Sequence, residues 1–174
     1  MLNRLVVFSL GEQSYALSLR AVLRVVRMVE LTPLPRAPEI VLGVIDVQEE
    51  IVPVMSMRKR FGLAEPEISL RDQLIVADTT TRRVALVVTS VTGVVERREE
   101  DIITAAQIVP GLQCVDGISR LEDGLLFIHD LDLFLSQKEE QQLDGLLACG
   151  ATTESATRGS VSTEGVGRGS AAGE

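Results

Sequence analysis

The only histidine of the chain, His129, has two carboxylates close by, in the run Ile128-His129-Asp130-Leu131-Asp132. One imidazole and two carboxylates are a possible set of metal ligands. At a strand-to-helix turn, however, such close spacing rarely directs three side chains at one centre. We therefore interpret His129 as a structural residue at an element boundary, beside an aspartate that caps a helix. The sequence predicts no metal site here.

No other group of residues has the pattern of an active site. Cys114 lies in a strand pattern without a second histidine or a nearby basic residue that would lower its pKa. Glu49-Glu50 and Glu99-Glu100-Asp101 could be acid–base pairs, but both runs are typical of solvated loops. No glycine-rich phosphate loop follows a strand. We predict no catalytic residue and no cofactor, and hence a protein that is not an enzyme.

Charge and composition restrict the partners and the compartment. The chain has 174 residues and a formal net charge of −8, which argues against nucleic acid or an anionic membrane as the main partner. No apolar run approaches the roughly 20 residues needed to cross a bilayer, so we expect no direct membrane insertion. Cys114 and Cys149 are isolated, which makes a disulfide framework unexpected and favours a reducing cytoplasm.

The stretch Gly43–Met57 is the centre of the predicted fold. Two short apolar arms rich in β-branched residues flank a charged run, which predicts a β-hairpin. The expected turn at Gln48-Glu49 contains no Gly, Asn or Pro. A tight turn with positive φ would be strained there, so the sequence predicts a wider loop. Pro53 has no backbone donor, which places its strand at an edge or turns its nitrogen outward.

Further strands and turns follow the same kind of pattern. The predicted strands are Leu5–Leu10, Tyr15–Leu19, Leu74–Ala77, Val84–Val88, Val91–Glu96, Leu112–Leu121 and Gly124–Ile128. Arg20–Arg27 fits either a short helix or a third strand. Asp130 is expected to cap a helix that continues or restarts through Leu143 and Leu147. From Gly150 to Glu174 the chain has almost no large apolar residue, so we predict a disordered tail.

The second half of the chain repeats the first. Leu5–Arg27 aligns without a gap with Leu74–Glu96, and Gly43–Gly62 aligns with Gly117–Ser136. Chance pairing in a chain rich in valine is the alternative, but the two alignments agree on one architecture. We predict a mainly β domain over residues 1–149, duplicated as about 1–70 and 71–136 and followed by a C-terminal helix. Two small β-barrels side by side would fit this pattern.

Three segments resemble one family. They read LVVFSLGEQSYALSLRAVLRVVR, PLPRAPEIVLGVIDVQEEIVPVMSMRKRFGL and VDGISRLEDGLLFIHDLDLFL, and they resemble the CheW-like domain of bacterial chemosensory systems from Leu5 to about Ser136. The resemblance implies two intertwined five-stranded SH3-like barrels with exchanged strands. It also implies a cytoplasmic adaptor in receptor arrays, which joins the cytoplasmic tip of a methyl-accepting chemoreceptor to the regulatory domain of a CheA-type histidine kinase.

The resemblance assigns two sets of contact residues. The receptor would bind a groove between the barrels, formed by Leu19, Val22, Val25, Ala85, Val91 and Val94. The alternative for each of these residues is that it belongs to the core. The kinase would bind an edge formed by Gly43, Asp46, Val47, Gln48 and Glu49.

Several positions depart from the family pattern. The family hairpin commonly reads Asn-Leu-Arg-Gly, whereas this chain has Asp46-Val47-Gln48-Glu49. Arg24 stands where the family usually has Glu, and Ser56 and Thr89 stand where it usually has Asp. A second function therefore stays open, a divergent CheW-like module that serves another signalling complex without standard kinase coupling. A small-molecule-binding domain would need a pocket with convergent polar groups, for which the sequence shows no cluster.

Overall fold

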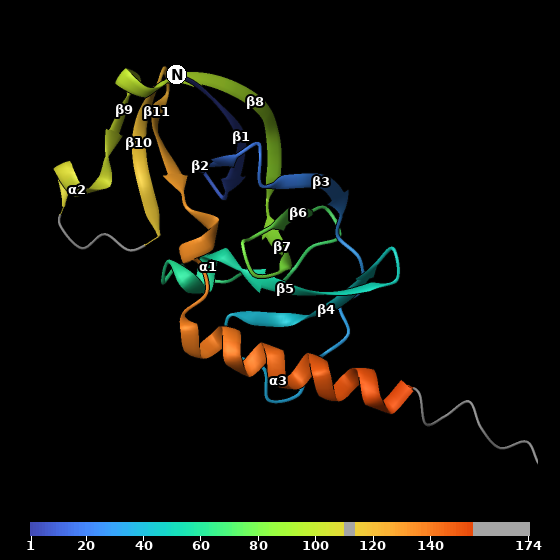
Figure 1. The fold of residues 1–174 in the computed structure, drawn as a ribbon. Helices are drawn as coiled ribbons and strands as arrows, with labels where there is room; N and C mark the ends of the chain where they lie inside the picture. Colours follow the sequence, from blue (N-terminus) through green and yellow to red (C-terminus); the bar gives the residue numbers. More distant parts are fainter. Residues whose placement is uncertain (110–113, 155–174) are drawn as a thin grey trace, which may run out of the picture.

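Two β-sheets dominate the computed structural model, which describes residues 1–109 and 114–154 (Figure 1). The first sheet contains β1 (Leu2–Leu10), β2 (Gln13–Ser18), β8 (Ser90–Arg98), β9 (Ile102–Thr104), β10 (Val115–Leu121) and β11 (Gly124–His129), in the order β8-β1-β2-β11-β10-β9. The second contains β3 (Val22–Arg27), β4 (Val41–Val47), β5 (Glu50–Ser56), β6 (Gln73–Asp78) and β7 (Arg83–Val88), in the order β3-β6-β7-β5-β4. The predicted fold class is confirmed, with the strand alternative correct for Arg20–Arg27. β9 makes the first sheet six-stranded rather than five-stranded.

Short helices connect these strands, and one longer helix ends the described chain. They are α1 (Met57–Arg60), the 3-10 turn η1 (Glu99–Asp101), α2 (Ala105–Ile108), the 3-10 turn η2 (Leu131–Leu133) and α3 (Gln137–Glu154). Asp130 caps η2 as expected, since its carboxylate accepts a hydrogen bond from the Asp132 N–H at 2.9 Å. In the described part of the chain, no helix is both long and apolar enough to cross a membrane.

Each sheet takes strands from both halves of the chain, so the halves are intertwined. In the sheet orders, β8-β1-β2-β11-β10 occupy the places of β3-β6-β7-β5-β4. The β-bulges also correspond, because Leu23 and Thr92 are the extra residues of β3 and β8, and Leu42 and Asp116 those of β4 and β10. These pairs match the alignment of the two halves. They support the predicted duplication, which stays an inference about how the chain arose.

The largest core cluster lies between the two sheets. Phe8 and Leu17 of the first sheet pack in it with Met55 and Leu86 of the second, and all four side chains are fully buried. Phe134, after η2, joins the same cluster. Burying a side chain of this size contributes roughly 1.5–3 kcal/mol. Separating the sheets would expose all of them, so neither sheet has an independent core of comparable size.

The β4–β5 turn is tighter than the sequence predicts. Val47 pairs directly with Glu50, so only Gln48 and Glu49 form the turn, with φ of 52° and 66°. The prediction of a wider loop was therefore wrong. Both faces of β5 are buried, since Val52 and Val54 pack in the core of the second sheet and Met55 packs in the cluster between the sheets. This burial fixes the register of the hairpin. Asp46 Oδ1 also accepts a hydrogen bond from the Glu49 N–H at 2.9 Å, which stabilises the strained turn.

Pro53 lies in a strand that is not at an edge. β5 has β7 on one side and β4 on the other. The β5–β7 ladder, however, begins at Val54, one residue after the proline. The missing donor therefore interrupts no pairing in that ladder, in agreement with an outward nitrogen.

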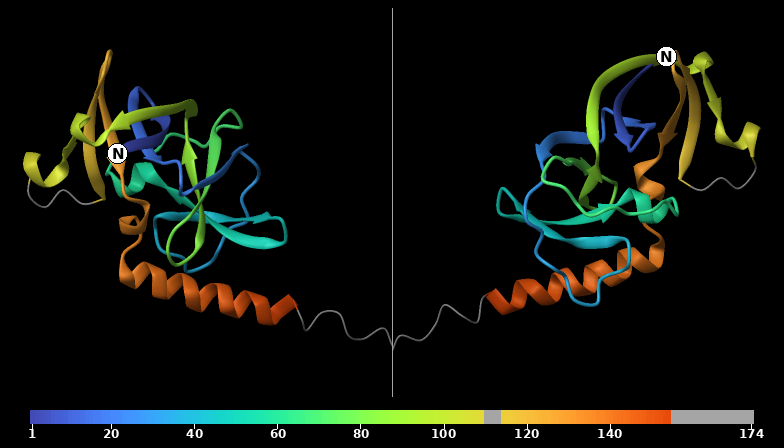
Figure 2. Two further views of the ribbon diagram at one scale, coloured as in Figure 1. Left: turned by 45° about the horizontal axis from the view of Figure 1, so that its top comes forward. Right: turned by 180° about the vertical axis from the view of Figure 1, so that it is seen from behind.

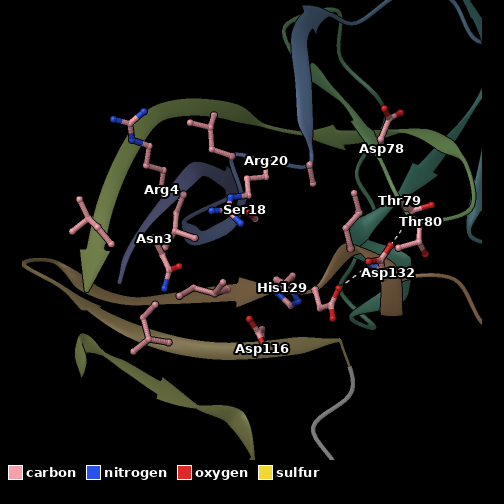
Figure 3. A pocket seen from close by; sticks show the side chains of 18 residues that line it. Asn3, Arg4, Ser18, Arg20, Asp78, Thr79, Thr80, Asp116, His129 and Asp132 are labelled. Carbon is pink, nitrogen blue, oxygen red and sulfur yellow. Dashed lines mark hydrogen bonds between the residues drawn. The ribbon is translucent and has the colours of Figure 1, made fainter. Parts of the chain in front are cut away.

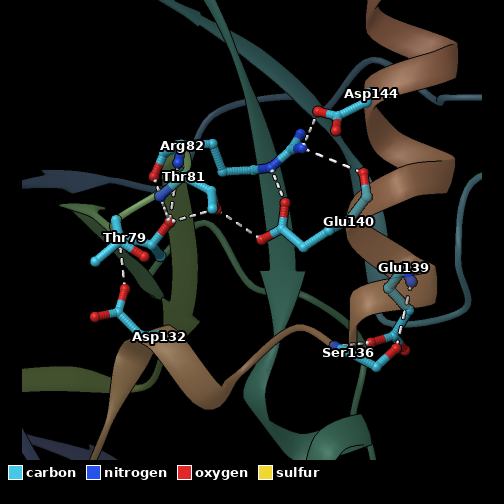
Figure 4. Close-up of polar contacts among 9 residues, drawn as sticks. Thr79, Thr81, Arg82, Asp132, Ser136, Glu139, Glu140 and Asp144 are labelled. Atoms are coloured by element: carbon cyan, nitrogen blue, oxygen red, sulfur yellow. Dashed lines mark hydrogen bonds and ion pairs between the residues drawn. The ribbon is translucent and has the colours of Figure 1, made fainter.

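An arginine and a buried leucine hold the C-terminal helix α3 in place, and the contacts of the arginine are drawn in Figure 4. The Arg82 guanidinium at the start of β7 contacts the Glu140 carboxylate at 2.6 Å and also the Asp144 carboxylate. Leu143, between them in sequence, is fully buried in the largest core cluster. Two further views show α3 at the opposite end of the molecule from the N-terminus (Figure 2).

The structure also corrects the predicted boundary of the tail. We expected order to end before Gly150, but α3 extends to Glu154. The contacts of α3 with the rest of the fold lie at Glu140, Leu143 and Asp144, and the helix continues beyond them. The rest of the predicted tail, 155–174, lies outside the described residues.

The strain in the β4–β5 turn predicts a stabilising substitution. Glu49→Gly removes the Cβ that makes positive φ costly, and we expect the free energy of unfolding to rise by about 1 kcal/mol. Glu49→Ala is the matched control, because it removes the same charge but retains the Cβ. Urea unfolding of both variants measures the difference. Equal stabilisation by Gly and Ala would show that charge, and not backbone strain, limits stability at this turn.

Candidate functional site

The predicted receptor groove lies where the largest core cluster reaches the surface. β3 and β8 each end a sheet, so one side of each strand is free of a neighbouring strand in the described residues. Val22 of β3 and Val91 of β8 are half-buried against the same core cluster. The Val91 N–H donates to Gln73 Oε1 of β6 at 2.6 Å, which joins the start of β8 to the sheet that contains β3.

Two other groove residues are exposed. Val25 lies opposite Ile75 in the β3–β6 ladder and is 38% exposed. Val94 lies opposite Val6 in the β1–β8 ladder and is 54% exposed. Opposed residues in an antiparallel ladder point to the same side, and Ile75 belongs to the core cluster that Val22 contacts. The strand edges therefore offer apolar side chains that a partner can reach.

Ala85 was wrongly assigned to the groove. It is fully buried in the middle of the second sheet, in a core cluster with Val54 and Val76. A partner cannot contact it without unfolding β7. In this strand the apolar pattern reflects burial, which was the alternative stated for each groove residue.

Leu19 lies at a cleft of about 920 Å³ between the β1–β2 layer and the end of β11 (Figure 3). Several polar groups of this cleft are engaged with one another or with groups beside it. The Thr80 N–H donates to Asp132 Oδ1 at 2.7 Å, and Arg4 contacts Glu96 at 3.0 Å. Polar groups that are already paired do not converge on a ligand. Arg20 and Asp116 also line the cleft without a side-chain partner among the described residues, and His129 Nε2 is buried without a hydrogen bond. These groups do not by themselves assign a small-molecule site.

The predicted kinase edge is an acidic hairpin tip. Asp46, Gln48 and Glu49 are exposed, and Val47 packs half-buried on the core of the second sheet. Ile51, which the sequence analysis did not assign to this edge, is exposed beside them. Arg83 of β7 forms an ion pair of 2.7 Å with Glu50 beside the tip and one of 2.8 Å with Asp78. No local pattern points to Arg83, because its partners come from other strands.

Gly43 was wrongly assigned as a contact residue of this edge. It is buried, and a Cβ added there would lie 2.7 Å from the backbone oxygen of Thr32. Thr32 pairs with Val44 and covers the middle of the outer edge of β4. Glycine is thus required for close packing of the chain, and the reachable surface is limited to the tip.

His129 belongs to an aromatic cluster rather than to a ligand set. Its ring stacks on Phe61 at 4.4 Å and lies 5.4 Å from Tyr15, between ring centroids. Nδ1 lies 2.7 Å from the Cys114 carbonyl oxygen, which can only accept, so Nδ1 carries the proton. Burial lowers the pKa of His129 from 6.5 to about 4, although the bond to Cys114 opposes this shift. His129 is thus neutral and structural at physiological pH.

Cys114 is also structural. Its thiol donates to the Leu133 carbonyl at 2.9 Å, and the side chain is buried. Burial raises the pKa of the thiol, which keeps it protonated and unreactive.

Comparison with known proteins finds one family. The model of the CheW-like domain matches residues 4–139. The chain is 26% identical over 149 residues to the chemotaxis protein CheW of Treponema pallidum, which covers 82% of this chain and 88% of that protein. It is 27% identical over 141 residues to CheW of Rhizobium meliloti, covering 80% and 91%. The crystal structure of the scaffolding protein TtCheW from Thermoanaerobacter tengcongensis superposes with a TM-score of 0.72 at 28% identity, covering 80% of this chain and 96% of that one.

Burial of His129 predicts that stability falls in acid. Below pH 6.5 the unfolded chain takes up a proton at this residue, whereas the folded chain does so only near pH 4. His129 should therefore cost about 3 kcal/mol of unfolding free energy between pH 6.5 and pH 4. His129→Phe retains the stacking but cannot titrate. The unfolding free energy of wild type should therefore fall relative to that of the variant as pH falls from 6.5 to 4. Parallel stability curves from urea unfolding at each pH would contradict this account.

Proposed function

The chain belongs to the CheW-like domain family of non-enzymatic scaffold proteins, and on this premise we propose that it couples chemoreceptors to a CheA-type histidine kinase. The family match and the curated CheW relatives support a chemotaxis adaptor. The observation that carries the finer proposal is the separation of two reachable surfaces. Val22 of the groove packs on the core cluster between the sheets, whereas Val47 of the hairpin packs on the separate core of the second sheet. The two surfaces therefore adjoin different cores, so partners at the groove and at the hairpin tip need not compete.

The apolar groove suits the receptor. Val22, Val25, Val91 and Val94 lie on the free sides of β3 and β8. The cytoplasmic tip of a methyl-accepting chemoreceptor is a helical hairpin, and such a hairpin buries its apolar face in a groove of this kind. No bound cofactor is needed for this recognition.

The hairpin tip suits the regulatory domain of the kinase. Val47 and Ile51 supply apolar contact next to the exposed Gln48 and Glu49. The protein would act in the cytoplasm at receptor arrays, through protein–protein contacts. It would require neither nucleic acid nor direct membrane insertion.

A second candidate function rests on the chemistry of the same tip. Asp46, Glu49 and Glu50 place three carboxylates on it, and of these three Arg83 contacts only Glu50. A kinase surface that binds an arginine at the position of Gln48 would be negatively charged, and the three carboxylates of the tip would repel it. In this case the chain is a divergent CheW-like module that serves a different signalling complex.

Substitution in the groove tests receptor binding. Val94→Asp should weaken binding of a receptor tip fragment at least tenfold, about 1.4 kcal/mol, because the carboxylate loses water in the bound state. The side chain is already exposed, so the variant should fold normally by circular dichroism. Leu125→Asp, at an exposed position of β11, is the matched control and should bind like wild type. Equal affinity of all three proteins in a titration would remove β8 from the interface.

Restoring the family turn tests kinase binding and separates the two candidate functions. Gln48→Arg with Glu49→Gly should tighten binding to a typical CheA regulatory domain, since an arginine–carboxylate hydrogen bond contributes roughly 1.5–3 kcal/mol. A gain that persists at high salt indicates the hairpin contact, and one that disappears indicates general charge attraction. If the wild type already binds tightly and the double variant binds no better, the hairpin tip is not the kinase surface.

A further inference from the structure

The edge strand β3 and the turn before it carry arginines without partners. Arg20, Arg24 and Arg27 are exposed, and in the described part of the chain their side chains make no hydrogen bond or ion pair. Five other arginines form ion pairs, namely Arg4, Arg60, Arg82, Arg83 and Arg98. Among the described residues, Arg36, Arg71 and Arg120 also lack a side-chain partner, but they are scattered along the chain. Three unpaired guanidinium groups within eight residues are unexpected in a chain of net charge −8. They make this edge locally basic.

Apolar side chains stand between these arginines. Leu23 is 47% exposed, and Val25 and Val29 are exposed as well. We call Arg20, Leu23, Arg24, Val25, Arg27 and Val29 the β3 edge. The strand pairs with β6 only, and no described strand covers its other side. The β3 edge is therefore both apolar and basic, and it is accessible.

The carboxylates near the β3 edge do not neutralise it. Asp78 is held by Arg83 at 2.8 Å, and Asp72 Oδ2 accepts a hydrogen bond from the Ser69 N–H at 2.9 Å. Glu30 follows the strand but makes no ion pair with its arginines. The arginines of the β3 edge are therefore free to pair with the carboxylates of a partner.

We propose that the β3 edge binds an acidic, amphipathic helical segment of a protein partner. Leu23 and Val25 would contact its apolar face, and Arg24 and Arg27 would contact its carboxylates. The partner is the receptor tip if the proposed function holds, and this inference then defines the charge that a cognate tip must carry. Charge complementarity of this kind selects among partners more than it raises affinity.

The geometry favours a helix over an added strand. Arg24 lies opposite Val76 and Arg27 opposite Gln73, so the two side chains leave β3 on opposite faces of the sheet. Only a partner that lies along the outer edge of the strand contacts both. The bulge at Leu23 interrupts the regular spacing of backbone groups that an added strand would need. The net charge of −8 disfavours nucleic acid or an anionic membrane at the same place.

Charge reversal at single positions tests the inference on the full chain. The probe is the cytoplasmic tip fragment of a chemoreceptor from the same organism, titrated calorimetrically. Arg24→Glu and Arg27→Glu should each weaken binding about tenfold, and the loss should shrink at high salt. Arg120→Glu, at an exposed and unpaired position of β10, changes the net charge equally and should stay within about twofold of wild type. A tip fragment with one acidic residue changed to Lys should restore binding to Arg24→Glu.

The outcomes separate this inference from the proposed function. If the tip binds wild type and binds Arg24→Glu, Arg27→Glu and Arg120→Glu with the same affinity as wild type, the β3 edge is not an acidic-partner site. Receptor coupling then still stands. If the tip does not bind wild type, receptor coupling fails. A synthetic amphipathic helix with Glu beside its apolar face then decides the inference, against the same peptide with Gln. The inference is supported if wild type binds the Glu peptide more tightly than the Gln peptide and Arg24→Glu loses this preference. It is overturned if wild type binds both peptides equally.

Other occupants of the β3 edge would also overturn the proposal. The β3 edge would be a surface for polyanions if double-stranded DNA or vesicles with anionic lipid bind wild type but do not bind Arg24→Glu. A change of oligomeric state in Arg24→Glu by sedimentation would show that a second copy of the chain covers the edge.

Discussion

The core cluster between the two sheets is the contact on which the rest of the structure depends. Phe8 and Leu17 on one side and Met55 and Leu86 on the other are fully buried only when both sheets are complete. Because each sheet takes strands from both halves of the chain, neither half can form its share of this cluster alone. The exchange also leaves β3 and β8 at the ends of their sheets, where the cluster meets the solvent.

That arrangement is the basis on which we propose two separate binding surfaces for one small chain. The groove follows the free edges of β3 and β8 beside the core cluster between the sheets, whereas the hairpin tip joins β4 and β5 beside the core of the second sheet. Helix α3 is fixed to the second sheet through Arg82, and Leu143 completes the shared core. Packing therefore positions the surfaces relative to each other, as the work of a scaffold requires. The surfaces themselves have few buried residues, which leaves their chemistry free to diverge.

Local patterns in the sequence were enough to predict most of the strands, the Asp130 cap and the mainly β fold, but they missed β9 and left Arg20–Arg27 open between helix and strand. Tertiary contacts decided what these patterns could not. Ala85 and Gly43 look like surface residues in a family comparison but are buried, one by the second sheet and one by Thr32. The tight turn at Gln48-Glu49 contradicts local preference because strand register and the Asp46 hydrogen bond outweigh it. The unpaired state of Arg24 and Arg27 became visible only once every neighbouring carboxylate had been placed.

Hydrogen–deuterium exchange of the full chain, alone and bound to each partner, tests the central claim most directly. Separate surfaces predict that a receptor tip fragment slows exchange in β3 and β8 and leaves residues 46–51 unchanged. A kinase regulatory domain should slow exchange at residues 46–51 and leave β3 and β8 unchanged. Protection of the same strands by both partners would contradict the account, because the two surfaces would then not be separate.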